Sequence, residues 1–514
     1  MIRKRSRKQL QERIDSLTSK TPQRESRVPE DFSDYEQALR ETWNHCDDLK
    51  IAVFRIGVSQ VLVCWLDGLV DRHAMQVGIL DRLTAVELAV DGISHLEPLL
   101  VGAPIVYCDT MGVVHRRISD GHVVVYLGGM HQALSIDLTN LPGRAVESSQ
   151  NEPSIEGPQE ALVETLNMNI AMVRKRLKSP RFKVETRRIG EVTDTPVAVL
   201  YVEGIVDPKL VVEIRERLSR IQIDSILDVN YVREMIRDAP WSLFPTTEST
   251  ERPDKITSAM LQGRIAILVH GATHALILPA VFVQYLIAAE DSYSNFYLAT
   301  GIRILRHIMF WISVVLPALY VSLLSYHQDL IPTPLLISLE GQHEGIPFPT
   351  YVEAFLMQFF FEALREAGQR LPRAVGQSVS IVGGLVIGDA AVNAGIVSPG
   401  MVIVVASTGI ASFTIASYTL VNTSRVLQFC FLAAAALLGL YGVVLLGIIV
   451  ITHMVSIRSL GVPYMAPYAP LSFPEMKDTI LRAPWWLMKT RPQIFSPTDA
   501  VMNKTPEPGS ETGD

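Results

Sequence analysis

The feature that most constrains this chain is a run of 25 residues, 427–451, without a charged side chain. About 20 apolar residues are enough to cross the hydrocarbon core of a bilayer as a helix. A second apolar run, at residues 308–324, follows Arg303 and Arg306. The sequence therefore predicts an α-helical, multi-pass membrane domain in the second half of the chain.

Cations around these runs predict how the membrane domain is oriented. The arginines before the first run and Arg458 after the last place both ends in the cytoplasm under the positive-inside rule. With a return through residues 348–364 and a further crossing at 401–418, the domain has about four spans. Because both ends of the domain lie on the same side, the number of crossings must be even. The glycine-rich residues 378–399 are therefore predicted to form a re-entrant element rather than a fifth crossing.

Polar side chains within the predicted membrane domain are candidates for function, because charges are costly there. Asp389 and Asn393 are four residues apart and share a helix face. They can pair with polar neighbours in a close-packed bundle, or line an ion path formed by several subunits. Glu353, Glu362 and Arg365 are further candidates for this polar face. Glu362 and Arg365 can pair within one helix, Glu353 lies roughly opposite, and anchoring at the membrane interface is favoured for all three.

The first half of the chain contains two pairs of similar segments, and we call each such pair an echo. A strand-like run at residues 61–66 recurs at 197–202, each followed by an acid, a glycine and a predicted helix. A hairpin-like run at residues 121–129 aligns without gaps with residues 263–271. Two echoes in the same order predict an α/β region built from two duplicated subdomains.

Four glycines follow these runs and are assigned to turns: Gly68, Gly129, Gly204 and Gly271. Glycine is preferred where a turn needs a positive φ, so turn geometry is favoured over a ligand site at these positions.

Residues 160–178 have the apolar spacing of an amphipathic helix. Its last turn is basic and includes Arg174. A solvated helix end is the favoured interpretation, because cations are stabilised at a helix C-terminus, and contact with phospholipid headgroups is the alternative.

These patterns divide the chain into seven predicted parts. In order, they are a polar N-terminal tail (1–33), a first α/β subdomain (34–147), a linker (148–158), a second α/β subdomain (159–290), a helical membrane domain (291–457), an interfacial or cytoplasmic C-terminal segment (458–495) and a disordered tail (496–514).

Composition and motif content exclude several functions. A net charge of -7 argues against nucleic-acid binding, and four scattered cysteines without CxxC spacing indicate reduced thiols. No nucleophile–base pair, metal-ligand spacing or phosphate-binding loop is present, so we predict no enzyme, no cofactor and no metal. The basic N-terminus lacks an apolar segment, and the α/β region is therefore expected to stay in the cytoplasm.

Several longer motifs resemble the spore germination receptor A-subunit (GerA) family. They are Thr250-Glu-Arg-Pro-Asp-Lys255, Phe361-Glu-Ala-Leu-Arg-Glu-Ala-Gly368, Ile381-Val-Gly-Gly-Leu-Val-Ile-Gly388 and Arg482-Ala-Pro-Trp-Trp486. The resemblance covers about residues 155–490 and implies a protein in the inner membrane of bacterial endospores. It also implies a transporter-like B subunit and a lipoprotein C subunit as partners, and a homo-oligomeric channel that releases ions when nutrients are sensed.

The chain departs from the family pattern at three places, one of which is Ala272-Thr-His274 where the family usually has Thr-Pro-Phe. His270-Gly271 replaces the usual Asp-Gly at the second hairpin turn, and Asp389 followed by Asn393 replaces Gln followed by Glu. The acid and the amide are thus kept on one face but exchanged by one turn. Two alternatives remain open: an accessory sporulation membrane protein of the same family that aids ion release, and a secondary transporter.

Overall fold

The computed structural model describes residues 26–56, 59–85, 96–100, 104–140, 152, 156–370, 388–503 and 505. The chain forms two compact units, which we call the α/β unit and the helical unit. The α/β unit contains Met1–Arg237, Ser249–Pro279 and Pro484–Asp514, and the helical unit contains Asp238–Glu248 and Ala280–Ala483.

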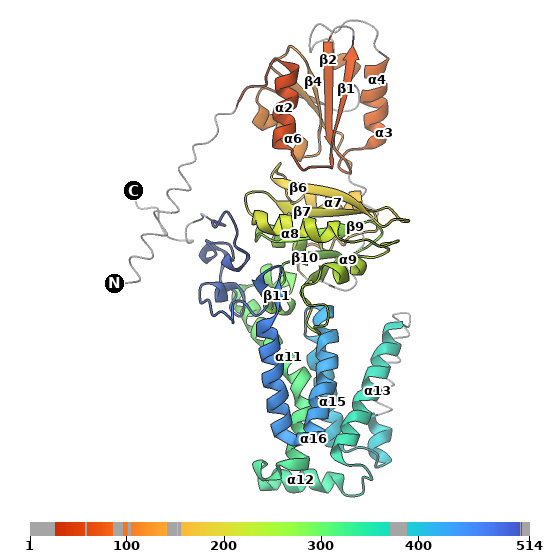
Figure 1. Cartoon of the computed structure of the whole chain (residues 1–514), viewed down its shortest axis with the longest axis vertical. Coiled ribbons are helices and arrows are strands. Elements are labelled where there is room, and N and C mark those ends of the chain that lie inside the picture. The colour runs from red at the N-terminus through yellow and green to blue at the C-terminus, as the bar shows by residue number, and fades with distance from the viewer. Residues whose placement is uncertain are drawn as a thin grey trace, which may run out of the picture. The chain divides into compact units, whose positions relative to one another are not determined.

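The α/β unit contains two five-stranded sheets (Figure 1). The first has the order β1-β2-β4-β5-β3, with β1 (Leu49–Ile56), β2 (Ser59–Leu66), β3 (Ile105–Cys108), β4 (Val123–Leu127) and β5 (Ala133–Ile136). The second has the order β6-β7-β9-β10-β8, with β6 (Phe182–Ile189), β7 (Thr195–Val202), β8 (Glu248–Thr250), β9 (Ile265–Val269) and β10 (Ala275–Leu278).

Both faces of the first sheet are covered, since successive side chains of a strand point to opposite faces. Leu62 and Cys64 of β2 belong to the core that includes helices α2 and α6, and Val61 and Val63 belong to the core beneath α3, η1 and α4. The helices of this subdomain are α2 (Phe32–Thr42), α3 (Arg72–Met75), η1 (Gln76–Leu80), α4 (Asp81–Thr84), η2 (Glu97–Leu99) and α6 (Met111–Ser119).

The second subdomain adds four helices to its sheet. They are α7 (Leu166–Arg174), α8 (Pro208–Ser219), α9 (Val229–Ile236) and α10 (Pro253–Leu261). Side chains of α7 and α10 share one core with β7 and β9.

The duplication predicted from sequence is confirmed by the strand pairing. In the antiparallel pair β2–β4, Val63 lies opposite Val125. In β7–β9, Val199 lies opposite Ile267. These are the residues that the two sequence echoes align, so the two sheets share their strand order and also their register.

The four turn glycines all have a positive φ: 86° at Gly68, 88° at Gly129, 75° at Gly204 and 86° at Gly271. A side chain at Gly68 would also collide with the backbone, because its Cβ would lie 2.8 Å from the Asn167 carbonyl oxygen. These positions therefore have the geometry that the turn interpretation requires.

The basic end of the predicted helix at residues 160–178 differs from expectation. The helix is shorter, Leu166–Arg174, and Arg174 is fully buried instead of solvated. Its guanidinium donates to both Asp48 carboxylate oxygens, at 2.8–2.9 Å, and to the Phe182 carbonyl oxygen at 2.9 Å. It also lies over the ring of Trp43, 5.4 Å from the centroid. The partner Asp48, 126 residues away in sequence, explains why the helix pattern alone was misleading.

This ion pair joins the two α/β subdomains. Asp48 precedes β1 and Arg174 ends α7. A parallel bridge between Cys46 and Val184 lies nearby, and the buried Lys183 ammonium donates to the Thr42 carbonyl oxygen at 3.0 Å. The subdomains are therefore locked by buried charge as well as by apolar packing.

We expect Asp48→Ala to lower the free energy of unfolding of the α/β unit by about 3–5 kcal/mol, because it leaves a buried guanidinium unpaired. Asp120→Ala, which removes an exposed pair with Lys178, is the matched control and should cost at most about 1 kcal/mol. Denaturant unfolding of the purified full-length protein measures both. Equal losses for the two variants would contradict the locking role.

Two predicted boundaries of the α/β region need correction. Of the predicted tail, residues 1–25 lie outside the described residues, but residues 26–33 pack on the first subdomain. Val28 is buried and donates its backbone N–H to Asp109, and the Tyr126 hydroxyl donates to the Pro29 and Glu30 carbonyl oxygens. Aromatic and backbone partners far along the chain hold this polar segment in place.

The C-terminal segment also differs from its prediction. Residues 496–503 belong to the predicted disordered tail, yet Thr498 donates its backbone N–H to the Ile205 carbonyl oxygen at 2.9 Å and Thr490 forms a β-bridge with Val501. Most of the predicted linker at residues 148–158 lies outside the described residues. Glu152, which is described, pairs with Lys255 at 3.0 Å and accepts from the Thr250 hydroxyl.

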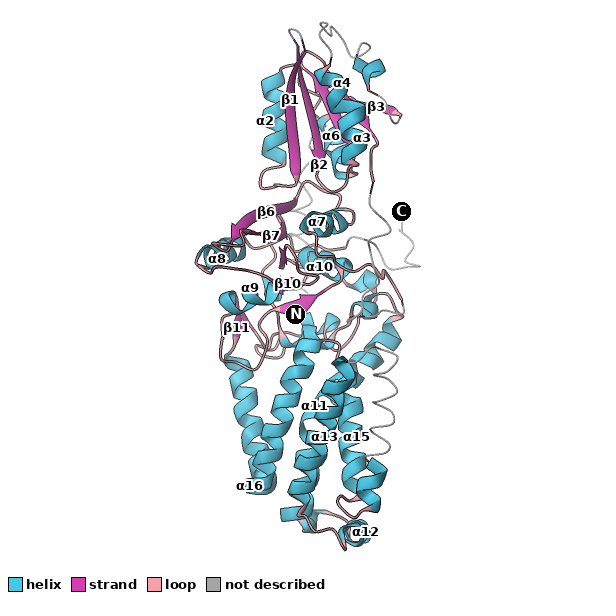
Figure 2. Ribbon diagram, turned by 90° about the vertical axis from the view of Figure 1, so that its right-hand side faces the viewer, coloured by secondary structure: helices cyan, strands magenta, loops and turns pink. Residues whose placement is uncertain are grey.

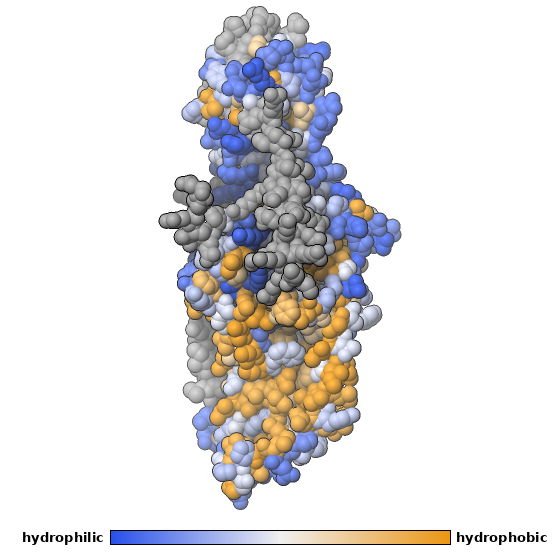
Figure 3. Space-filling model, turned by 90° about the vertical axis from the view of Figure 1, so that its left-hand side faces the viewer, coloured by the Kyte–Doolittle hydropathy of each residue, from blue (hydrophilic) through white to orange (hydrophobic). Residues whose placement is uncertain are grey.

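The helical unit contains the apolar runs. Its long helices are α11 (Phe296–Tyr326), α12 (Thr333–His343), α13 (Thr350–Arg370), α15 (Pro399–Phe413) and α16 (Tyr418–Ser456). Among the described residues, α11 and α16 are the two helices long and apolar enough to cross a membrane. Figure 3 shows apolar side chains over much of the visible face of this unit. The shorter elements are η3 (Phe282–Leu286), η4 (Ala289–Ser292), η5 (Gln328–Leu330), η6 (Glu475–Asp478) and the hairpin of β11 (Arg458–Ser459) and β12 (Val462–Pro463).

Helix α16 reverses direction at Gly439, where φ is 59° and ψ is -143°. Thr423 and His453 would be about 45 Å apart in a straight helix. Instead, the Thr423 hydroxyl donates to the Leu243 carbonyl oxygen at 2.8 Å, and His453 contacts the adjacent Ser242 at 2.9 Å. Both ends of α16 therefore lie at one end of the helical unit, and Figure 2 shows its two legs meeting at the turn.

This reversal corrects the predicted crossings. Residues 427–451 do not form one span, because Gly439 divides them between two legs. Residues 401–418 are also broken, since α15 ends at Phe413 and α16 begins at Tyr418. A re-entrant element at residues 378–399 follows from parity only if residues 427–451 cross once, and the reversal at Gly439 removes that condition. Residues 378–387 lie outside the described residues, so that element stays a prediction.

We expect Gly439→Ala to destabilise the helical unit by about 1–3 kcal/mol, since only glycine readily adopts this backbone conformation. The added Cβ would also lie 2.9 Å from Cβ of Tyr326. Gly447→Ala, in the second leg and with open space around it, is the control and should not destabilise. Thermal unfolding in detergent compares them, and an unchanged Gly439→Ala midpoint would refute the strained turn.

Candidate functional site: polar clusters of the helical unit

The predicted polar residues fall into three separate places in the helical unit. Glu353 lies near the start of α13, Glu362 and Arg365 lie near its end, and Asp389 and Asn393 lie in a helical turn before α15. The structure brings Glu362 and Arg365 together, and Asp389 and Asn393 together.

Glu353 of α13 is fully buried, and its carboxylate lies against the start of α15. One carboxylate oxygen, Oε2, accepts the Ser398 backbone N–H at 2.8 Å, and the other lies 3.3 Å from Nε2 of His343. Ser398 is the N-cap of α15, with its side chain accepting from the Met401 backbone N–H. A carboxylate is stabilised at a helix N-terminus. Glu353 therefore fixes the start of α15 from the inside of the bundle and is not an exposed interfacial anchor.

Glu362 and Arg365 form a cluster with Arg425 of α16. Arg425 Nη2 lies 2.5 Å from Glu362 Oε2, and Arg365 Nη1 lies 3.5 Å from Glu362 Oε1. The Arg365 guanidinium also donates to the Ser412 hydroxyl at 2.7 Å and lies 5.1 Å from the ring centroid of Phe413. The predicted pair within one helix is thus part of a cluster in which two cations share one carboxylate.

A second contact joins the same two helices. The buried Gln428 side chain of α16 donates to the Gln358 side-chain oxygen at 2.8 Å. Because Glu353 meets the start of α15 and Arg365 meets Ser412 near its end, α13 and α15 run parallel. The side chains of α13 thereby hold three helices together with polar contacts.

Asp389 and Asn393 are both exposed and contact each other. Nδ2 of Asn393 donates to Asp389 Oδ2 at 3.0 Å. The pair shares one helix face, as the spacing of four residues predicts. The pair lies at the start of the described residues that follow the undescribed segment 371–387.

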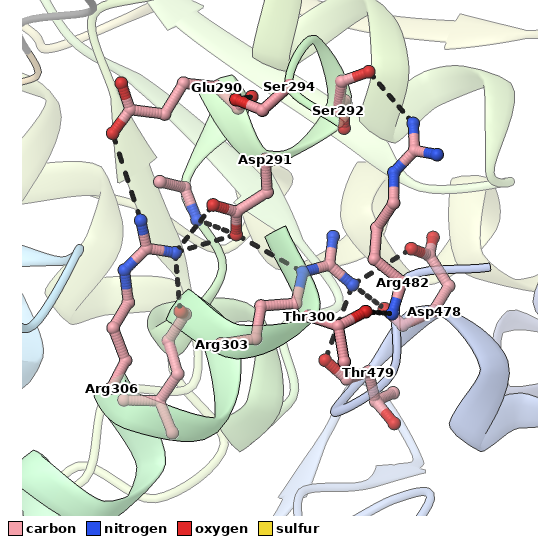
Figure 4. A network of polar contacts seen from close by, with 12 residues as sticks. Glu290, Asp291, Ser292, Ser294, Thr300, Arg303, Arg306, Asp478, Thr479 and Arg482 are labelled. Carbon is pink, nitrogen blue, oxygen red and sulfur yellow. Dashed lines mark hydrogen bonds and ion pairs between the residues drawn. The ribbon is translucent and has the colours of Figure 1, made fainter. Parts of the chain in front are cut away.

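A further polar cluster of the helical unit is centred on Asp291 (Figure 4). Its buried carboxylate receives Arg306 at 2.7–2.8 Å and Arg303 at 3.3 Å, two residues one turn apart on α11. The Arg303 guanidinium also donates a hydrogen bond to the Asp478 carboxylate at 3.1 Å. Arg482 donates to the Ser292 carbonyl oxygen at 2.9 Å. The network thus fixes the first turns of α11 to η4 and to the segment around Asp478.

The sequence indicates that Arg303 and Arg306 are cations flanking a span, but it does not indicate their role in this network. The structure buries both side chains. Their spacing of three residues signals a shared face. Asp291 lies 12 and 15 residues earlier and Asp478 lies 175 residues later, and no local pattern connects them.

The described residues offer little for metal or thiol chemistry. None of them forms a group of three or more His, Cys, Asp or Glu side chains that could hold a metal ion. The cysteines are free, and burial raises the pKa of the Cys46 and Cys108 thiols to about 11. Such thiols are poor nucleophiles at neutral pH.

Asp291→Asn should lower the stability of the helical unit by about 3–5 kcal/mol, because two buried guanidinium groups lose their shared counter-charge. Glu290→Gln is the control: its carboxylate is 32% exposed and 3.9 Å from Arg306, so its loss should cost at most about 1 kcal/mol. Thermal unfolding of both variants in detergent tests this. A small loss for Asp291→Asn would show that the network does not hold α11.

Comparison with known proteins identifies the class. The profile of the Bacillus/Clostridium GerA spore germination protein family matches residues 37–494. Spore germination protein KA of Bacillus subtilis (strain 168) is 41% identical over 477 residues, which are 91% of this chain and 87% of that protein. The uncharacterized membrane protein YfkQ of the same strain is 41% identical over 75% of each chain.

A solved structure also matches. The crystal structure of the N-terminal domain of the A subunit of the Bacillus megaterium spore germinant receptor GerK3 is 31% identical, with a TM-score of 0.40, and the match covers 50% of this chain and 98% of that one. The chain belongs to the GerA spore germination protein family, as the extent of the profile match and the 41% identity require.

Proposed function

We propose that this chain is the A subunit of a spore germinant receptor in the inner membrane of an endospore-forming bacterium. The observation that carries the proposal is the family match over residues 37–494, which includes both units. In this role the chain takes part in nutrient-triggered germination with a transporter-like B subunit and a lipoprotein C subunit. The α/β unit lies in the cytoplasm.

The helical unit is proposed to cross the membrane several times. Support comes from the apolar character of α11 and of α16, the two candidate spans among the described helices. Most outward side chains of the second leg of α16 are apolar, including Val444, Ile448 and Ile451. Such a surface is suited to lipid and costly to expose to water.

We further propose that several copies assemble around an ion path lined by Asp389 and Asn393. Both side chains are exposed in the single chain and carry one negative charge on one face. An exposed acid is tolerated at membrane depth where it faces water or a partner. Glu353, Glu362 and Arg365 are assigned a supporting role, since their contacts hold α13, α15 and α16 together.

Cation release from spores after nutrient addition tests the ion path. Asp389→Asn removes the charge, and we expect the initial release rate to fall at least about tenfold, equivalent to about 1.4 kcal/mol on the barrier. The double variant Asp389→Asn with Asn393→Asp returns one charge to the same face and should restore release.

The control for this experiment is Glu366→Gln, which neutralises an exposed acid of α13 that pairs with Arg370. It should leave release unchanged. Normal release by Asp389→Asn would sink the charged face while leaving the receptor assignment standing. Normal germination of spores that lack the whole chain, with their other receptors removed, would sink the receptor assignment.

A further inference from the structure

The segment Asp238–Glu248 has an unusual place in the fold. In sequence it follows α9 and ends at the first residue of β8, yet it packs within the helical unit. Phe244 is buried in the same core as α11 and α16, and the Tyr285 hydroxyl donates to the Pro245 carbonyl oxygen at 2.9 Å. The chain therefore leaves the α/β unit after α9 and contributes this loop to the helical unit.

Polar contacts hold this loop against both ends of α16. Ser242 meets His453 near the end of the second leg, and the Leu243 carbonyl oxygen meets Thr423 near the start of the first. The Ser459 hydroxyl, just beyond α16, donates to the Thr246 carbonyl oxygen at 2.7 Å. The backbone of the loop is thus fixed relative to the apolar legs.

On this fixed backbone, two apolar side chains point away from the protein. Trp241 is 98% exposed and Leu243 is 48% exposed. Their neighbours Ser242 and Phe244 face inward, where they make the contacts described above. The loop therefore presents Trp241 and Leu243 at the end of the legs that carry the outward apolar surface.

We propose that Asp238–Glu248 is a lipid-docking loop, with Trp241 and Leu243 inserted at the boundary between headgroups and acyl chains. The proposal rests on the proposed membrane location of the helical unit. Tryptophan favours this boundary, because its ring is apolar while its N–H can bond to water or headgroups. The exposed Arg458, next to Ser459, supplies a cation for lipid phosphate. The outward apolar side chains at the same end of α16, among them Ile451 and Val455, select lipid as the occupant.

The depth of residue 241 in a bilayer tests the proposal. Trp241→Cys is made with Cys430→Ser, which removes the exposed native thiol, while the buried Cys46, Cys64 and Cys108 stay unlabelled. The labelled full-length protein, carrying an environment-sensitive fluorophore, is reconstituted in vesicles of equal parts phosphatidylcholine and phosphatidylglycerol. Spin-labelled lipids then quench from the headgroup or from the middle of the acyl chain.

Two further variants, each with one accessible cysteine on the Cys430→Ser background, provide the reference depths. Ile448→Cys, outward on the second leg of α16, reports the acyl region, and Val192→Cys, exposed on the α/β unit, reports water. We expect the label at 241 to be quenched more by the headgroup spin label than by the mid-chain one. At 448 the order should reverse, and at 192 neither lipid should quench.

The outcomes separate the two proposals. Lipid quenching at 448 but none at 241 would overturn the docking loop alone, with Trp241 facing water or another protein. Absence of lipid quenching at both 448 and 241 would overturn the membrane location on which the loop depends. Deeper quenching at 241 than at 448 would also overturn the proposal, because the loop would then lie inside the bilayer.

Discussion

The reversal of α16 at Gly439 is the constraint on which the rest of the helical unit depends. The second leg of α16 runs back alongside the first, so the two ends of α16 lie close together. Ser242 and Leu243 can therefore contact both ends. The β11–β12 hairpin then follows directly and meets Thr246 through Ser459. A residue with a β-carbon would strain this turn, and glycine therefore favours the fold in which these contacts form together.

Buried arginines perform a similar task in both units. Arg174 relies on Asp48, and Arg303 and Arg306 share Asp291. A buried ion pair adds little net stability, but a buried charge without its partner is strongly penalised. Each pair therefore discriminates against arrangements in which the elements meet in another way. These contacts are specific mainly because an arrangement that leaves a buried arginine unpaired is strongly destabilised, and less because the correct ion pair adds stability.

Features that repeat locally were predictable, and features that depend on distant partners were not. The strand runs and turn glycines of the two subdomains follow from periodicity and composition, and their common register follows from the alignment of the echoes. The two legs of α16 could not be separated by hydropathy, because both are apolar and Gly439 is one glycine among several in that run. Glu362 and Arg365 were paired correctly by spacing, whereas Arg425, 63 positions beyond Glu362, left no local signal.

The shared register of the two sheets also shows where the two copies have diverged. Equivalent residues are 136 positions apart at Val61 and Val197 but 142 positions apart at Gly121 and Gly263. The interval between these points, which contains Asp238–Glu248, is therefore six residues longer in the second copy. The two halves of the repeat thus share a register but not a length, and the longer half is the one that contributes a segment to the helical unit.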